Sequence, residues 1–168
     1  MNVTAIRAGF LTSVQDLGRI GLREFGISLG GALDPHALRV ANLLVGNDES
    51  AAGLEITFGG LRLRFADERI IAWCGGDFAA QIGATPLPSG HPGLIRRGEE
   101  FFIESPILGC RAWVTISGGI DASIVLGSRS ADLRAGFGGA NFRPLRDGQG
   151  FSLAMSSGRS QTLIEKLR

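Results

Sequence analysis

Short runs of alternating apolar and polar residues, separated by glycines, dominate the chain. In LRLRF (residues 61–65) the three apolar side chains point to one side and the two arginines to the other. Such a period of two is typical of a half-buried β-strand. Two glycines separate this run from LEITF (residues 54–58), so the two runs are predicted to form a tight hairpin.

The same plan continues along the chain. RIIAW is followed by FAAQI-GA-TPLP, which has the spacing of a second hairpin, and LIRRGEEFFIE has Gly98 at a predicted turn. In CRAWVTI, every second residue from Cys110 to Ile116 is expected on one face. Many short strands at this spacing predict a barrel or a sandwich.

One segment, LDPHALRVANLLVGN, breaks the pattern and predicts a helix near residues 34–45. Asp34 can cap the first backbone N–H groups, Pro35 suits the first helical position, and Gly46 suits the position after the end. The fold is therefore predicted to be mainly β, a barrel over residues 1–150 with one principal α-helix. Residues 151–168 are more polar and are expected to form a frayed tail or a short helix.

The length and charge of the chain exclude several classes of protein. With 168 residues, one domain is expected. The net charge of +1, with 17 basic and 16 acidic residues, indicates no nucleic-acid partner. No apolar run approaches the ~20 residues of a membrane span, so no membrane partner is expected. The N-terminus lacks the pattern of a signal peptide, and a cytoplasmic location is expected.

Cysteine and histidine suggest no special chemistry. Cys74 and Cys110 both lie in apolar runs and are interpreted as buried free thiols, with a disulfide or a reactive thiol as the alternatives. His36 and His91 lack metal-ligand spacing, so no metal site is expected. The phosphate-binding loop and the nucleophile elbow of hydrolases are also absent from the sequence.

The stretch TSVQDLGRIG is the first candidate site. Gln15, Asp16 and Arg19 offer an amide, a carboxylate and a planar guanidinium between glycines, which suits a carboxylate or amide ligand. The alternative is a salt bridge between Asp16 and Arg19 within a turn, with no ligand.

The predicted helix carries a second set of candidates. Asp34 is either a helix cap or a ligand-binding residue. Arg39 and Asn42 are three residues apart, so they are predicted to share a face that points at a pocket or at water.

The stretch VLGSRSADLRAGFGG is the last candidate. Arg129 and Arg134 bracket Asp132, and glycines such as Gly136 leave backbone N–H groups uncovered. Successive free N–H groups can form a nest for an anion. The alternative is a loop whose arginines and aspartate satisfy one another.

Six motifs in fixed order give the chain a family resemblance: TSVQDLGRIG, GGALDPHALRVANLLVGN, LEITFGG, CGGDFAAQIGATPLP, GCRAWVTISGGID and VLGSRSADLRAGFGG. Together they resemble the biotin-dependent carboxyltransferase-like family, which includes the C subunit of 5-oxoprolinase, KipA and allophanate hydrolase subunit 2. The resemblance covers residues 3–150 and implies a cyclophilin-like β-barrel. Members are usually about twice as long, so residues 151–168 could also begin a second half.

The resemblance implies three alternative functions. The first is a component of a 5-oxoprolinase complex, which works with a KipI-like B subunit and an A subunit, uses ATP and opens 5-oxoproline to glutamate. The second is carboxyl transfer from carboxybiotin to urea or another amide, which would bring in biotin. The third is a KipA-type regulator that binds a KipI-like kinase inhibitor. No cofactor is expected on this chain itself.

Under the 5-oxoprolinase hypothesis, the candidate residues take distinct roles. Arg19, Arg129 and Arg134 are expected to hold the substrate carboxylate. Gln15 is expected to bind the lactam carbonyl. Asp16 and Glu55 are the candidates for proton transfer. The other predicted substrate-binding residues are Asp34, Arg39, Asn42 and Gly136.

Overall fold

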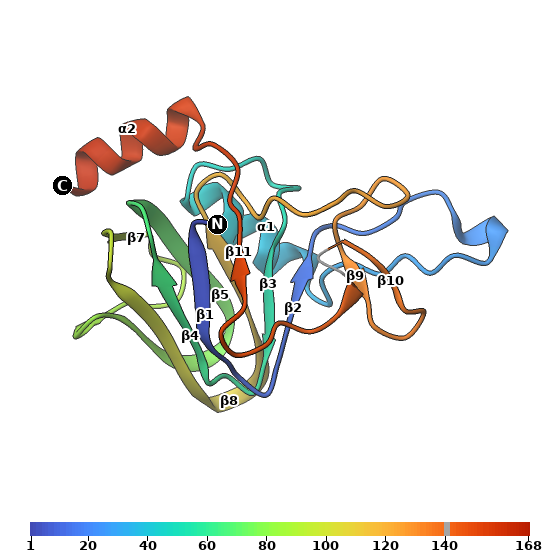
Figure 1. Cartoon of the computed structure of the whole chain (residues 1–168), viewed down its shortest axis with the longest axis horizontal. Helices are drawn as coiled ribbons and strands as arrows, with labels where there is room; N and C mark the ends of the chain where they lie inside the picture. The colour runs from blue at the N-terminus through green and yellow to red at the C-terminus, as the bar shows by residue number, and fades with distance from the viewer. Residues whose placement is uncertain (140–141) are drawn as a thin grey trace.

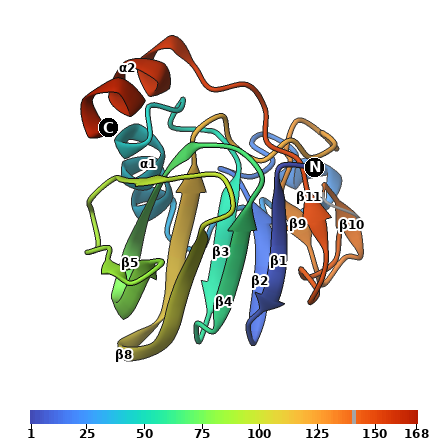
Figure 2. The ribbon, with the colours of Figure 1, turned by 60° about the vertical axis from the view of Figure 1, so that its left-hand side comes forward.

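The computed structural model describes residues 1–139 and 142–168, and its main feature is one curled β-sheet that forms a half-barrel (Figures 1 and 2). The strands run in the order β11-β1-β4-β8-β3-β2, and β5 lies on the other side of β8, where it also pairs β6 and β7. The prediction of a mainly β, barrel-like fold is confirmed. The strands are β1 (Val3–Ala8), β2 (Leu11–Gln15), β3 (Gly53–Thr57), β4 (Leu61–Phe65), β5 (Arg69–Ile82), β6 (Thr85–Pro86), β7 (Gly93–Ile95), β8 (Glu100–Ile116) and β11 (Gly150–Phe151).

The long strand β8 organises the sheet. Its first part pairs β4, with Ile103 opposite Leu61, and its later part pairs β3, with Arg111 opposite Thr57. The predicted hairpin between residues 54–58 and 61–65 is therefore wrong, because the two strands lie one after the other along β8. The connecting turn itself bonds to β8, since the Phe58 amide donates to the Cys110 carbonyl at 2.9 Å.

The other turn predictions had mixed outcomes. The hairpin at residues 83–84 is confirmed, because Gln81 pairs with Pro86 across it. The turn at Gly98 does not join a paired hairpin, because β7 pairs β5, with Ile95 opposite Arg69. In the two predicted hairpins that are wrong, at residues 59–60 and at Gly98, the strands pair instead with strands that are distant in the sequence.

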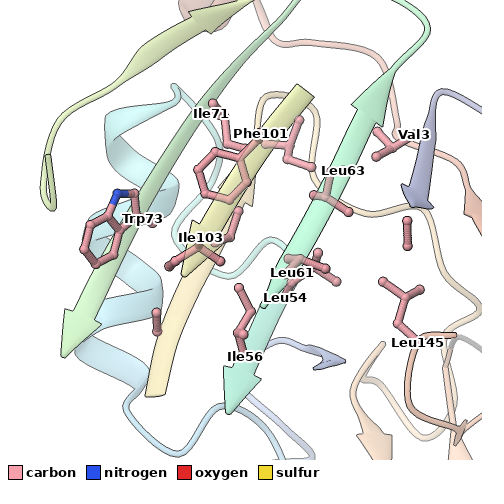
Figure 3. Close-up of a cluster of buried hydrophobic side chains, with 14 of the residues drawn as sticks. Val3, Leu54, Ile56, Leu61, Leu63, Ile71, Trp73, Phe101, Ile103 and Leu145 are labelled. Carbon is pink, nitrogen blue, oxygen red and sulfur yellow. The ribbon is translucent and has the colours of Figure 1, made fainter. Parts of the chain in front are cut away.

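The main core fills the inside of the curled sheet (Figure 3). The alternating residues Leu61, Leu63 and Phe65 are almost completely buried there, as their pattern predicted. Trp73 lies in the same core, and its indole N–H donates to the carbonyl of Leu87 at 2.8 Å, which satisfies its one polar atom.

Helix α1 (Pro35–Leu44) covers the outer face of the sheet, and the predicted helix is confirmed. The Asp34 carboxylate caps it by accepting from the Ala37 amide at 3.0 Å. Leu38 and Ala41 pack there against Trp113 of β8 and Cys74 of β5.

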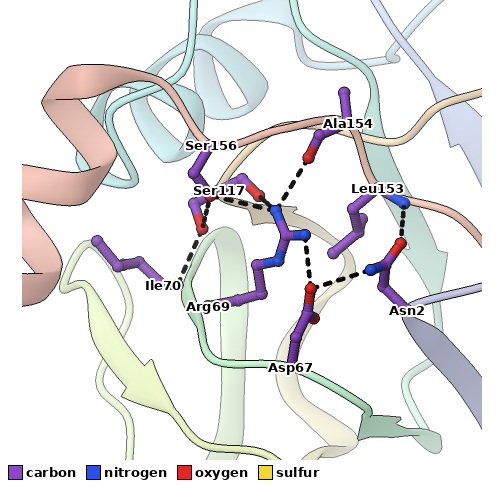
Figure 4. A network of polar contacts seen from close by, with 8 residues as sticks. All are labelled: Asn2, Asp67, Arg69, Ile70, Ser117, Leu153, Ala154 and Ser156. Carbon is purple, nitrogen blue, oxygen red and sulfur yellow. Dashed lines mark hydrogen bonds and ion pairs between the residues drawn. The ribbon is translucent and has the colours of Figure 1, made fainter.

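A second helix, α2 (Gly158–Leu167), ends the chain. Its Leu163 and Ile164 pack against Val45 and Ile70. The segment before α2 is fastened by Arg69, whose Nη1 donates to the carbonyls of Ser117 and Ala154 at 3.0 and 2.9 Å (Figure 4). The polar C-terminal stretch thus forms a short helix, one of its two predicted forms.

Two further observations concern surface properties. Cys74 is buried and Cys110 is exposed, and both are free thiols. The prediction that both would be buried is wrong for Cys110, because it lies in the largely exposed stretch 104–110 of β8. In the described residues, the helices are too short and too polar to cross a membrane.

Candidate functional site

Two loops meet beyond the end of β2. One runs from Asp16 to Asp34 and includes the short 3₁₀ helix η1 (Arg23–Phe25). The other contains the small strands β9 (Ala131–Asp132) and β10 (Phe137–Gly138), which pair with each other. Figure 1 shows β9 and β10 beside the end of β2, at the opposite side of the molecule from the C-terminus. The meeting of these loops brings the first and last candidate stretches together.

Asp16 joins the two loops. Its buried Oδ1 accepts from the hydroxyls of Ser128 and Ser130, both at 2.6 Å, and from the Gly18 amide at 2.8 Å. Its Oδ2 accepts from the Arg129 amide at 2.6 Å. Each of these donors belongs to the chain itself. The proton-transfer role of Asp16 stays a prediction, whereas its geometry is that of an organising residue.

Arg19 is the most unusual side chain of the site. It is only 1% exposed, its Nη2 donates to the Ser130 carbonyl at 2.7 Å, and its guanidinium lies 4.6 Å from the centre of the Phe137 ring. In the described part of the chain, its Nε and Nη1 have no hydrogen-bond partner, and no Asp or Glu oxygen lies within ion-pair distance. The alternative of an Asp16–Arg19 salt bridge is therefore wrong.

Gln15 contacts the same second loop as Asp16 and Arg19. Its Nε2 donates to the Ser13 hydroxyl at 2.9 Å and to the Ala131 carbonyl at 3.1 Å, while its buried Oε1 has no partner among residues 1–139 and 142–168. Gln15 and Arg19 thus bind adjacent carbonyls of the second loop. Their predicted role in binding a carboxylate or amide ligand stays a prediction.

Asp132 has a shifted pKa. A hydrogen bond from the Ser28 hydroxyl is the main cause that lowers the pKa of this carboxyl, and the backbone amides of Ala135 and Arg134 lower it further. The positive charge of Arg19 adds a smaller lowering, and burial opposes it. No sequence signal identified Ser28, which is one of several polar residues of an irregular loop.

The prediction that the Gly136 amide is left free for an anion is wrong. The amides of Arg134 and Gly136 are used within the loop, by Oδ1 and the backbone carbonyl of Asp132 respectively. The Arg134 side chain is exposed, and the part-buried Arg129 contributes its backbone amide to Asp16. Asp132 accepts from Ser28 and from backbone amides, and no ion pair joins it to Arg129 or Arg134 in the described residues, so the alternative of a loop whose arginines and aspartate satisfy one another is wrong.

The helix candidates lie outside this cluster. Asn42 is completely buried, where its Nδ2 donates to the Ala51 carbonyl at 2.7 Å and its Oδ1 accepts from Asn47 at 3.0 Å. Arg39 is exposed whereas Asn42 is buried, so the prediction that the two point together at a pocket or at water is wrong. Asp34 acts as the helix cap.

Glu55, on β3, faces the start of α1. Its Oε2 accepts from the Leu33 amide at 2.8 Å and from the Trp113 indole at 3.0 Å, and its Oε1 lies 3.4 Å from Arg111 Nε. These contacts fasten the end of the first loop to the sheet. A proton-transfer role for Glu55 stays a prediction.

An open hollow of about 400 Å³ adjoins Arg19. It is lined by Arg19, Ile20, Gly21, Arg23, Glu24 and Leu29. Unpaired guanidinium donors beside a hollow suit a ligand with a negatively charged oxygen. The residues that the structure describes contain no group of three or more metal-binding side chains.

Comparison with known proteins assigns the family. Residues 25–167 match the model of the carboxyltransferase domain, subdomain A and B. The chain belongs to this carboxyltransferase family. It is 42% identical to the C subunit of 5-oxoprolinase from Escherichia coli over 151 residues, 90% of this chain and 49% of the relative. It is 38% identical to urea amidolyase of Lachancea kluyveri over 83% of this chain and 8% of that protein.

Solved structures of this family share the fold. The urea carboxylase of Kluyveromyces lactis superposes with a TM-score of 0.88 at 34% identity, over 93% of this chain and 14% of that one. The chain spans about half the length of the E. coli 5-oxoprolinase component that it matches. It therefore corresponds to a part of each of these relatives.

Proposed function

We propose that this carboxyltransferase-family chain is the counterpart of the 5-oxoprolinase C subunit, within an ATP-dependent complex that opens the lactam of 5-oxoproline to give glutamate. The main support is the 42% identity to that component of the E. coli enzyme over 90% of this chain. Its counterpart from Haemophilus influenzae is 35% identical over 81% of this chain.

The chemistry of the site supports this proposal. Substrate and product both carry a carboxylate, and Arg19 offers guanidinium donors that the described residues leave unused. Gln15 adds an amide next to it. We expect the partners to be an A subunit and a KipI-like B subunit, with ATP used by the assembled complex.

Reconstitution tests the proposal. The purified chain is mixed with the A and B subunits of the same organism, 5-oxoproline and ATP, and glutamate release is measured. Release that depends on this chain supports the proposal. Equal release without the chain would contradict it. So would no release with all components, in an assay where the full-length E. coli counterpart is active as a control.

A second candidate function is carboxyl transfer from carboxybiotin to urea or another amide. The TM-score of 0.88 with the K. lactis urea carboxylase favours it. One assay distinguishes the two functions. Carboxyl transfer consumes carboxybiotin and leaves 5-oxoproline intact. The first proposal instead predicts that glutamate is released from 5-oxoproline without biotin.

A further inference from the structure

Arg19 carries a buried positive charge, and no Asp or Glu oxygen of the described residues lies within ion-pair distance of it. Removing a guanidinium from water costs several kcal/mol unless an anion and hydrogen-bond acceptors compensate. Among the described residues, Nη2 alone has an acceptor, the Ser130 carbonyl. Asp132, whose pKa Arg19 lowers slightly, lies beyond ion-pair distance and is held in place by Ser28 and by amides of its own loop.

The surroundings hold the guanidinium in one orientation. The Phe137 ring lies against the guanidinium group, and the bond to Ser130 fixes its rotation. Two glycines make room for it: a Cβ on Gly30 would lie 3.0 Å from Nη1, and one on Gly138 would lie 2.8 Å from Nη2. A cation fixed in advance binds an anion without the entropy cost of ordering a long side chain.

The hollow gives a route to Arg19. The unpaired Nε and Nη1 have almost no contact with solvent, so a ligand reaches them only when part of the wall shifts. Ile20 and Arg23 in that wall are exposed, and η1 has no buried residue. A segment with so few buried contacts opens at low cost.

We propose that Arg19 is the carboxylate-binding residue of a small-molecule site, which opens to the hollow when residues 20–29 shift. The ligand carboxylate supplies the missing negative charge and accepts from the guanidinium. The inference deepens the proposed function, on which it rests for the choice of 5-oxoproline as the ligand.

The test uses the full chain and its arginine Nε–H signals in ¹⁵N NMR, with the Arg19 signal assigned by its loss in Arg19→Lys. The unaltered chain is titrated with 5-oxoproline and with 2-pyrrolidinone, the same lactam ring without the carboxylate. We expect a saturable shift of the Arg19 signal with 5-oxoproline only. No shift in the unaltered protein, or equal shifts with both compounds, would overturn the inference.

Calorimetric affinities complete the test. Arg19→Lys should weaken 5-oxoproline binding roughly tenfold or more, because lysine lacks the planar fork of donors. The matched control Arg97→Lys, at an exposed position in the turn before β8 and outside the candidate site, should bind like the unaltered chain. Equal binding by both variants overturns the inference. The NMR titration of the unaltered protein tests the inference even if Arg19→Lys does not fold.

The inference and the proposed function fail separately. Binding of 5-oxoproline at Arg19 without glutamate release by the complex contradicts the proposed function and leaves the carboxylate site intact. Glutamate release with full activity in Arg19→Lys, and no Arg19 shift, contradicts the site and leaves the proposed function intact.

Discussion

The carboxylate of Asp16 accepts a 2.6 Å hydrogen bond from the hydroxyl of Ser130, which lies 114 residues further along the chain. The Asp16 amide returns a bond to the same hydroxyl oxygen at 2.8 Å. These two hydrogen bonds join the loop after β2 to the segment directly before β9. It also fixes the Ser130 carbonyl, to which Arg19 donates.

We expect Asp16→Asn to lower the free energy of unfolding by about 3 kcal/mol, because buried donors would lose a charged acceptor. Urea unfolding followed by circular dichroism measures the change. Asp121→Asn is the control, since Asp121 is exposed, and it should stay within about 0.5 kcal/mol of the unaltered protein. Equal stability of both variants would show that Asp16 does not organise the loops.

A second prediction concerns Arg69, which holds the C-terminal segment (Figure 4). Arg69→Met removes the buried partner of Asp67 and of two carbonyls, so it should cost about 3 kcal/mol. Hydrogen exchange at residues 153–157 should also become faster. Arg168→Met breaks an exposed pair with Glu68 and should cost no more than about 1 kcal/mol. Unchanged exchange in Arg69→Met would refute the fastening role.

Gly59 shows why the chain turns where it does. It adopts φ +67°, and a Cβ there would overlap the Glu104 carbonyl of β8. Gly59→Ala should therefore cost more than about 3 kcal/mol, whereas Gly83→Ala, at φ +56° with open space, should cost only the left-handed strain of about 1–2 kcal/mol. Thermal unfolding compares the two. Similar losses would mean that contact with β8 does not matter.

The sequence predicted what local residues decide. The cap at Asp34 and the proline after it specify the start of α1, and both act within one helical turn. Strand pairing depends on distant residues, because β3 and β4 both pair with β8, which lies far from them in the sequence. Two glycines between alternating runs are compatible with a hairpin and with two strands placed along a third, so the pattern could not choose.

The residues of the candidate site were also predicted only in part. Gln15, Asp16 and Arg19 were identified because an amide, a carboxylate and a guanidinium between glycines of one short loop together suit a carboxylate or amide ligand. Their partners Ser28 and Phe137 carry no pattern of their own and are specified only by tertiary contacts. Asn42 was misread because a helical period places a side chain on a face but does not say what that face touches.

The last prediction separates the two thiols. Cys110 is exposed, whereas Cys74 is buried, and burial raises the pKa of the Cys74 thiol. The thiolate is the reactive form, so a maleimide at pH 8 should label Cys110 at least roughly tenfold faster than Cys74. Peptide mass spectrometry after short exposures gives both rates. In Cys110→Ser, label should enter only after guanidinium unfolds the chain. Rapid labelling of this variant in its native state would show that the α1 face of the sheet opens readily, because Cys74 packs directly beneath that helix.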